Sequence, residues 1–506
     1  MSSQSEIFSS DFARHPDMRN NHMKKYQLYK KLYIEREDIV AEAKKLGQAL
    51  GVTDDIKGRV GLTGSHSSFP GPIANDVLDE IVEAQEKRRA LPDLVDELRD
   101  VVKDYYGDEY DAAPIASGEA ALWTIIDTTM TSPMLGRGSA YRCRYVAPFE
   151  RHVSHQSGFG RPFPPKYKYV ASERYITSGE LGVEGKRLTN LDTVLVPFAG
   201  ARYDAHGIKY YPTPLLSTVD GARSAEKVEE IAQRHGSMIT GFASLAYDTP
   251  GYGYGAKGED GAPEFQRRVA RIAEKFNVPY ITDNAWGMPF IGTDIRKTGA
   301  SAIFYSVDKV MRGPLSSLII GKDEVLVPVR RALAMHSHRY GSPMAYAKAM
   351  YSAFDPGREA IVAQIHILKS IKENPESWKA LADETYKIAN EEFEDNFSFN
   401  DRFKDGIIIT KTYNNLGVEI NYDRTWGGDG ALGIPIFTEE DSFSGTALIE
   451  SALSAMGILP TITYDGNILI SPGQGTIDRE GKLIQERMRL AVRALVGVIE
   501  IICKHS

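Results

Sequence analysis

Apolar positions in the first hundred residues follow a helical spacing. The stretch 21–51 mixes Lys and Glu with spaced Leu, Ile and Ala, and a loop rich in Gly, Ser and Pro follows at 61–72. From Ile73 to Tyr106 apolar residues recur at the three-to-four-residue period of a helix face. This pattern predicts a mostly helical lead-in, a loop and further helix before the main fold.

From about residue 112 short apolar runs alternate with amphipathic segments. The expected strands are Tyr145–Pro148, Thr193–Phe198, Ile208–Tyr211, Met238–Ala246, Pro279–Thr282, Ala302–Ser306 and Leu315–Ile320. The expected helices between them are Ala225–Gln233, Pro263–Phe276 and Asp294–Thr298. Such alternation is typical of an α/β fold with a mainly parallel sheet sandwiched by helices.

The last third of the chain predicts a smaller α+β domain. Residues 323–400 are mostly helical, with helices expected at Glu324–Ala332 and Ile361–Phe393. After them come expected strands and helices at Gly406–Thr410, Gly417–Tyr422, Leu459–Thr463, Asn467–Ser471, Ala447–Met456 and Leu483–Cys503. We expect three parts: an N-terminal helical segment with an active-site loop (1–72), a large domain (73–340) and a small C-terminal domain (341–506).

Composition and charge narrow the class of protein. The 506 residues are 42% hydrophobic and 25% charged, as in ordinary globular proteins. With 60 Lys and Arg against 68 Asp and Glu, the net charge is −8, which offers no general attraction to nucleic acid or anionic membrane. No uninterrupted apolar run reaches the roughly 18 residues of a membrane span, and the N-terminus shows no apolar leader core. We therefore expect neither a nucleic-acid partner nor a membrane.

Cysteine usage indicates a reducing compartment. Cys143 and Cys503 are the two cysteines, too few for a disulfide framework or a Cys-rich metal site. The sequence predicts reduced thiols, a cytoplasmic protein and no bound metal.

A first candidate motif is a small-residue turn before an apolar helix, Ala116-Ser117-Gly118-Glu119-Ala120-Ala121. Free N–H groups and the positive end of the helix dipole at such a start favour a phosphate. The alternative is an ordinary N-cap in which Ser117 satisfies the first turn.

Two further motifs follow expected strands. Asp283-Asn284-Ala285-Trp286-Gly287 lies where ligands bind in α/β sheets, and its carboxylate can hold a protonated heterocyclic nitrogen. Ser306-Val307-Asp308-Lys309 presents a lysine at a buried strand end, where a lowered pKa favours Schiff-base formation. Taken singly, they are also an Asp-Asn turn and a surface lysine.

The order of the three motifs resembles that of pyridoxal-phosphate (PLP) enzymes of fold type I, the aspartate-aminotransferase fold. The resemblance covers roughly residues 70–340 and implies PLP as the cofactor. It implies that Lys309 forms the Schiff base and moves the proton at Cα, and that Asp283 keeps the pyridine nitrogen protonated. It places the phosphate on Ser117, Gly118 and Glu119.

The same resemblance implies further site residues. His152 in Pro148-Phe-Glu-Arg-His152-Val-Ser154-His155 becomes the candidate that stacks on the cofactor ring, with His155 as second choice. Asn284, Ser306 and Arg312 complete the cofactor-binding set. Arg339 is a candidate substrate contact, because a guanidinium suits bidentate binding of a carboxylate or phosphate. His66 is another, because N-terminal segments often close over the site in this fold.

Two short sequence motifs are similar to those of the O-phosphoseryl-tRNA:selenocysteinyl-tRNA synthase family. The matching segments are Asn284-Ala285-Trp286-Gly287 and Ser306-Val307-Asp308-Lys309. An Asp before Asn284 is instead the arrangement of cystathionine-type lyases and aminotransferases. The acidic balance offers no tRNA surface, so only the cofactor machinery is carried over.

The resemblance favours a PLP-dependent lyase or transferase that eliminates or replaces a β-substituent of an amino acid or an amino-acid derivative. An aminotransferase is the second reading, disfavoured because the late strand Asn467–Ser471 carries no Arg. A decarboxylase is a lesser alternative, because Asp308 stands where many decarboxylases have His, and a non-catalytic protein of the same fold is the last. The fold also implies a homodimer or a higher homo-oligomer.

Overall fold

The structure is a computed structural model that describes residue 30 and residues 34–62, 71–130, 144–149, 209–214, 221–235, 239–246, 257–333, 352–398, 408–421, 439–460, 462–464, 467–473 and 475–505. The chain forms two compact units. The large unit comprises residues 65–378 and 413–415, and the small unit comprises 1–64, 379–412 and 416–506. The predicted domain boundaries after residues 72 and 340 remain a prediction.

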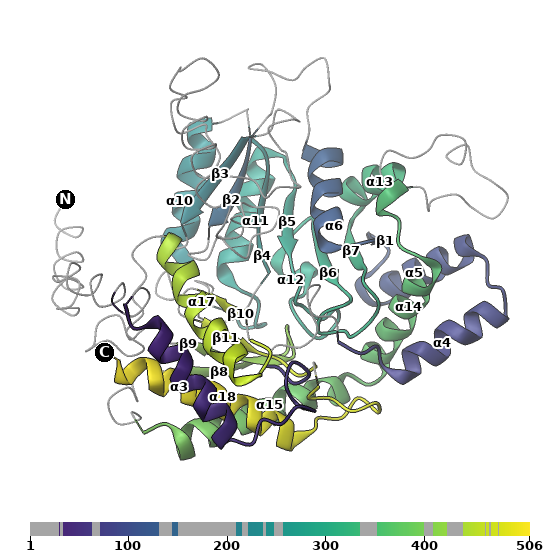
Figure 1. Cartoon of the computed structure of the whole chain (residues 1–506). Helices are drawn as coiled ribbons and strands as arrows, with labels where there is room; N and C mark the ends of the chain where they lie inside the picture. The colour runs from purple at the N-terminus through teal and green to yellow at the C-terminus, as the bar shows by residue number, and fades with distance from the viewer. Residues whose placement is uncertain are drawn as a thin grey trace, which may run out of the picture. The chain divides into compact units, whose positions relative to one another are not determined.

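A seven-stranded sheet forms the centre of the large unit (Figure 1). In spatial order its strands are β1 (Tyr110–Ile115), β7 (Ser317–Lys322), β6 (Ala302–Ser306), β5 (Tyr280–Asp283), β4 (Ile239–Leu245), β2 (Arg144–Phe149) and β3 (Lys209–Pro214). Strand β7 runs antiparallel to both of its neighbours, and the other pairs are parallel. The mainly parallel sheet predicted from the sequence is therefore confirmed.

Most predicted strands of the large unit match observed strands within a few residues. The exception among the described residues is β1, which the sequence analysis did not predict. Its sequence, YDAAPI, contains an Asp and a Pro and lacks the alternating β-branched pattern of a strand. The predicted strand Thr193–Phe198 lies outside the described residues.

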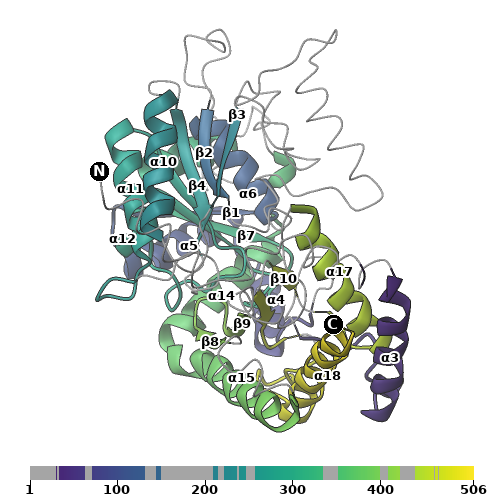
Figure 2. The same ribbon diagram turned by 90° about the vertical axis from the view of Figure 1, so that its left-hand side faces the viewer.

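Helices cover both faces of this sheet (Figure 2). The helices of the large unit are α4 (Asn75–Glu86), α5 (Leu91–Tyr106), α6 (Gly118–Ile125), the π-helical continuation η3 (Ile126–Met130), α10 (Gly221–His235), α11 (Glu264–Phe276), α12 (Ile295–Thr298), α13 (Asp323–Ala332), the 3₁₀ turn η14 (Ser352–Phe354) and α14 (Arg358–Glu373). α10 and α11 pack on one side of the sheet, against β2, β4 and β5, and α6 lies on the other, against β6 and β7.

Helix α11 illustrates why these segments fold as they do. Phe265, Val269, Ile272 and Ala273 are buried and recur at helical spacing on one face. The helix ends at Asn277, whose left-handed backbone (φ 51°) lets its N–H cap the last turn. The predicted helix Pro263–Phe276 is thus confirmed.

The small unit pairs a four-stranded antiparallel sheet with long helices. Its elements are α3 (Arg36–Ala49), β8 (Ile408–Thr412), β9 (Gly417–Asn421), α17 (Glu439–Met456), β10 (Ile462–Tyr464), β11 (Asn467–Ile470) and α18 (Gln485–Lys504), with most of α15 (Pro375–Asn396). Ile39, Leu453 and Val492 are fully buried in its core. Where α3 meets α17, a Cβ on Gly47 would come within 2.8 Å of the Met456 backbone.

The helical region predicted at Ile361–Phe393 is two helices rather than one. Helix α14 ends at Glu373 and α15 begins at Pro375, a residue suited to the first turn of a helix but not to its interior. No helix in the described part of the chain combines the length and apolar character needed to cross a bilayer.

Candidate active site at the ends of β5 and β6

Two neighbouring parallel strands of the large unit end in residues that the sequence singled out. β5 ends at Asp283 and β6 ends at Ser306, and Asp283 is paired with Phe304 in the register between the strands. Ligands bind at the carboxyl ends of strands in open α/β sheets. The fold therefore brings Asp283 and the turn after Ser306 to one edge, where chemistry is expected.

Asp283 is a buried carboxyl with little hydrogen-bond support. Its residue is 6% exposed, and its Oδ1 accepts a hydrogen bond of 2.9 Å from the Ala285 N–H. Burial raises the pKa of Asp283, although the positive charge of Lys309 and the Ala285 hydrogen bond act in the opposite direction. A carboxylate held in this environment is stabilised by a nearby cation.

Lys309 follows β6 in a tight, hydrogen-bonded turn. The Val307 N–H donates to Ser316 O at 2.9 Å, and the Arg312 N–H donates to Lys309 O at 3.0 Å. The Lys309 Nζ lies 5.0 Å from the centroid of the Trp286 ring, within the range of a cation–π contact. The lysine is half-buried, and its amine and the Asp283 carboxyl influence each other electrostatically.

The start of helix α6 closes the same edge. Ser117 is the N-cap residue, and its side chain accepts a hydrogen bond of 3.2 Å from the Ala120 N–H. A Cβ on Gly118 would lie 2.9 Å from Ser306 Oγ, so the helix start approaches the end of β6 closely. The N-cap alternative is correct for Ser117, and the same helix start also meets Ser306, next to the lysine turn.

Arg312 adopts a left-handed backbone conformation, with φ of 57°. Its guanidinium lies over the Trp378 ring at 5.1 Å from the centroid. The residue is half-buried and follows Lys309 by one short turn. The structure thus places Arg312 beside the candidate site, with its side chain stacked on an aromatic ring.

Asn284 forms a reciprocal pair with Asn414, a residue that the sequence analysis did not single out. Each side-chain amide donates to the other amide's oxygen at 2.9 Å, and both residues are buried. Asn414 is 130 residues away from Asn284 in sequence and lies in the turn between β8 and β9. The turn residues 413–415 belong to the large unit. The sequence gives no signal for this pairing beyond two adjacent Asn residues in a turn.

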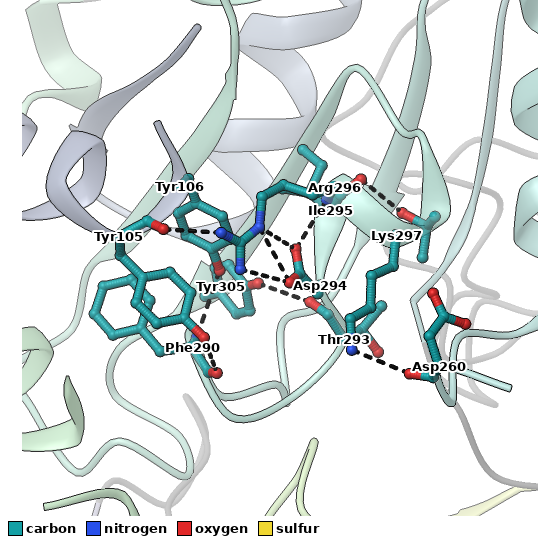
Figure 3. A network of polar contacts seen from close by, with 11 residues as sticks. Tyr105, Tyr106, Asp260, Phe290, Thr293, Asp294, Ile295, Arg296, Lys297 and Tyr305 are labelled. Atoms are coloured by element: carbon teal, nitrogen blue, oxygen red, sulfur yellow. Dashed lines mark hydrogen bonds and ion pairs between the residues drawn. The ribbon is translucent and has the colours of Figure 1, made fainter. Parts of the chain in front are cut away.

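The segment after this pair is held by aromatic residues of helix α5 (Figure 3). Phe290 has a φ of 70°, a left-handed conformation that non-glycine residues rarely adopt. Its carbonyl accepts a hydrogen bond of 2.6 Å from the Tyr105 hydroxyl, and its N–H donates to the Tyr106 hydroxyl at 3.4 Å. Side chains from α5 therefore support an unfavourable backbone conformation next to the site.

Arg296 joins the same support from the other side (Figure 3). Its guanidinium binds both oxygens of Asp294, donates to Tyr105 O at 2.9 Å and lies 4.9 and 5.1 Å from the centroids of the Tyr105 and Tyr106 rings. Tyr305, the residue before Ser306, is fully buried, and burial raises its pKa well above the usual value. Tyr305 therefore stays neutral behind the site.

Several predicted site residues lie outside the described part of the chain. These are His152, with its alternative His155, and the two substrate candidates His66 and Arg339. The backbone of Glu119 lies in the first turn of α6, but its side chain is likewise outside the description. Trp286 was noted only as part of its motif, and its contact with Lys309 shows that it belongs to the site.

Comparison with known proteins gives a fold and no close relative. No protein-family model and no curated protein matches the sequence. Among solved structures, taurine:2-oxoglutarate aminotransferase from Bifidobacterium kashiwanohense, solved with PLP and glutamate, is similar with a TM-score of 0.50 and 12% identity, covering 84% of this chain and 85% of that one. The chain has the fold type I architecture of PLP enzymes.

A second similar structure is the complex of SepCysS with the N-terminal domain of SepCysE. Its TM-score is 0.46 and its identity 12%, with 89% of this chain and 96% of that chain covered. The aminotransferase structure, with its TM-score of 0.50, confirms the fold class expected from the sequence.

Proposed function

We propose that this protein is a PLP-dependent enzyme that acts on an amino acid or an amino-acid derivative, and that it is a lyase or transferase. The observation that carries the proposal is the meeting of three features at one edge of the sheet: the buried Asp283, Lys309 in the next strand's turn, and the helix start at Gly118 against Ser306.

The helix start fits the phosphate of this cofactor. At a helix N-terminus the first backbone N–H groups have no partner within the helix, and they bind phosphate well. At Gly118 the absence of a side chain leaves the space in front of Ser306 Oγ open, because a Cβ there would lie 2.9 Å from that oxygen. We assign the phosphate to Ser117, Gly118, Glu119 and Ser306.

The buried acid fits the ring of the cofactor. Burial makes the charged form of Asp283 costly, and a cation at its side offsets this cost. A protonated pyridine nitrogen is such a cation. Lys309 supplies an amine in a half-buried turn beside Asp283, which suits covalent attachment to an aldehyde.

Bound here, PLP would supply an electron-accepting ring for reactions at the Cα of an amino acid. The chain's own residues have separate tasks. Asp283 holds the proton on the ring nitrogen, and Lys309 holds the cofactor and then moves the proton at Cα. Trp286 keeps the lysine amine over its ring, since Nζ lies 5.0 Å from the ring centroid. Arg312 and Asn284 complete the cofactor-binding set.

The type of reaction rests on the substrate side of the site. The late strand and the residue after it, Asn467–Ser471, contain no Arg that could bind a substrate carboxylate. This favours a lyase or transferase over an aminotransferase. We propose His152 as the residue that stacks on the cofactor ring, and His66 and Arg339 as substrate contacts. These three rest on the sequence alone.

The cofactor assignment is tested by labelling. Purified protein incubated with PLP is expected to be yellow, and borohydride reduction should fix the cofactor on Lys309, as read by peptide mass mapping. Lys309→Ala should abolish the label. Lys322→Ala is the matched control, because this lysine lies at the end of β7, at the opposite edge of the sheet. A label on another lysine contradicts the assignment.

The reaction is tested with a panel of amino acids. A lyase releases a keto acid and ammonia from a substrate that carries a β-leaving group, without an amino acceptor. A β-replacing transferase consumes the same substrate only when a nucleophile such as a thiol is added. An aminotransferase forms keto acid only with an amino acceptor such as 2-oxoglutarate, and that outcome would replace the proposed reaction by the second reading.

We also infer a homodimer. Leu78 and Val82, one turn apart on α4, are 42% and 57% exposed, and Leu315, in the turn after Lys309, is 61% exposed. A symmetric dimer is the commonest assembly that would bury such exposed apolar side chains. Light scattering is expected to give about twice the chain mass of 56.1 kDa, and Leu78→Lys with Val82→Lys should reduce it. A mass of one chain in active, cofactor-bound protein contradicts the dimer.

A cytoplasmic location completes the proposal. The support is the low cysteine content, two residues in a chain of 506. Fractionation of cells that express the protein would test it.

A further inference from the structure

We propose that Asn414 is a positioning residue of the active site: through the buried side chain of Asn284 it fixes the turn that carries Asp283. The inference rests on the proposed function for its catalytic meaning. The structural part stands on the contacts of Asn414 alone and is tested without cofactor.

Asn414 makes four polar contacts with one short segment of the large unit. Its side chain exchanges two hydrogen bonds of 2.9 Å with Asn284, and its Oδ1 also accepts from the Thr293 N–H at 2.9 Å. Its backbone carbonyl accepts from the Met288 N–H at 2.6 Å. One residue therefore ties down both ends of the segment 284–293.

The Thr293 contact decides the orientation of the amide pair. Of the two polar atoms in a side-chain amide, only the oxygen can accept a hydrogen bond from a backbone N–H. Asn414 Oδ1 must therefore face the Thr293 N–H. The Asn414 Nδ2 then faces Asn284 Oδ1, and Asn284 is fixed in turn. The oxygen and nitrogen positions of both side-chain amides are therefore determined by their hydrogen bonds.

Close packing leaves this arrangement little freedom. A Cβ on Gly292 would overlap Asn414 Oδ1, and a Cβ on Gly287 would overlap the Asn284 side chain. Glycine at both positions therefore lets the loop fold tightly around the amide pair. Asn284 is fully buried and Asn414 is 1% exposed, so water cannot replace a lost partner.

The path from Asn284 to the acid is one residue long. The Asn284 N–H donates to Phe304 O at 3.0 Å, and the Gly287 N–H donates to Asn284 O at 2.7 Å. Between them the Ala285 N–H donates to the Asp283 carboxyl. A rotation of Asn284 would therefore move the donor that orients Asp283.

The first test uses cofactor-free protein and amide hydrogen exchange. Asn414→Ala leaves the Asn284 amide and the Thr293 N–H without their partner, so exchange over 284–293 is expected to rise about tenfold. Asp111→Asn is the control, because it weakens a buried ion pair with Arg99 and Arg330 elsewhere in the large unit. Its exchange over 284–293 should match that of the wild type.

The second test uses cofactor-loaded protein. Because Asp283 is less well oriented, the ring nitrogen of the bound cofactor in Asn414→Ala should lose its proton at lower pH than in the wild type, as read from the cofactor's absorption, and cofactor affinity should fall about tenfold. A general loss of stability, as in Asp111→Asn, would leave the titration unchanged. Asn414→Leu, which is similar in size, adds no charge and removes both the acceptor for Thr293 and the donor for Asn284, should reproduce the shift.

The outcomes separate the two proposals. Wild-type exchange over 284–293 in both Asn414 variants overturns the positioning role, and so does an unshifted titration of the cofactor band in both. If Asn414→Ala does not fold, Asn414→Leu alone decides. A wild-type protein that takes up no PLP overturns the proposed function, while the exchange result still decides whether Asn414 fixes the loop.

Discussion

Replacing Asp283 by Asn removes one negative charge and little else. The residue is 6% exposed, and its carboxyl accepts a hydrogen bond of 2.9 Å from Ala285 N–H, which an amide oxygen can also accept. We therefore expect Asp283→Asn to fold with the same loop geometry. What is lost is the charge of the carboxylate, and with it the electrostatic interactions with Lys309 and with a protonated ring nitrogen.

The size of that loss follows from the burial of the acid. Two unit charges about 4 Å apart interact by about 4 kcal/mol at an effective dielectric constant of about 20. If this interaction stabilises the electron-accepting form of the cofactor in the transition state, kcat should fall about 1,000-fold. Attachment of the cofactor to Lys309, read by borohydride labelling, should persist.

In the cofactor-free protein, Asp283→Asn should not lower the folding stability. Because burial raises the pKa of Asp283, the folded state binds this proton more tightly than the unfolded state does. The group therefore lowers stability as the pH rises from its unfolded pKa, about 3.9, through its folded pKa. At pH 7, Asp283→Asn without cofactor is expected to have a Tm equal to or above that of the wild type, by calorimetry.

These two results together discriminate the proposed role from a structural one. A purely structural Asp283 would lose stability on substitution in both the cofactor-free and the cofactor-loaded protein. Near-wild-type kcat in a variant that carries the label on Lys309 would refute the charge argument, whatever the Tm does.

Three further substitutions probe the site and its scaffold. Gly118→Ala places a Cβ 2.9 Å from Ser306 Oγ and should lower PLP affinity about tenfold by fluorescence titration; adding Ser306→Ala should cause less further loss than Ser306→Ala alone does. Trp286→Ala should destabilise the protein by about 3–5 kcal/mol in urea unfolding, because the residue is 1% exposed, and Trp286→Phe should cost less while keeping a ring for Lys309. Asp111→Asn should cost about 1–3 kcal/mol at pH 7. Burial alone raises the pKa of Asp111, but arginine hydrogen bonds hold it below its usual value. The stability that this carboxylate contributes should therefore be lost from the wild type as the pH falls through the folded pKa. The variant should show a smaller decrease of Tm at acidic pH.

The elements that sequence reasoning located share a local signal. β5 and β6 are continuous apolar runs that end in polar residues, and α11 carries its buried positions at helical spacing. In each case a window of about ten residues holds the information. Asp283 and Lys309 were found because each lies within three residues of such a strand end.

Strand β1 carries no such local signal. Asp111 is an unusual residue for a buried strand, and it is tolerated there because Arg99 and Arg330, 12 and 219 residues away, bind its carboxyl. Pro114 lacks the N–H that a strand interior normally uses. Tertiary contacts, which no local window contains, decide that this segment is a strand.

Local sequence signals accompany both the split between α14 and α15 and the reversal of β7. Pro375 predicts a helix start rather than a helix interior, and the turn between β6 and β7 is too short for the crossover of about a dozen residues that a parallel neighbour requires. Both features therefore follow from local geometry.

The supports of the site have the opposite character from its reactive residues. Asn414 lies 130 residues from Asn284, and Tyr105 lies 185 residues from the Phe290 carbonyl that it holds. Nothing near these residues marks them, yet they orient the turn that presents Asp283. A chain can therefore carry the full set of motif residues and still differ in activity through its supports, so the exchange behaviour of the segment 284–293 is as informative about this site as the identity of Lys309.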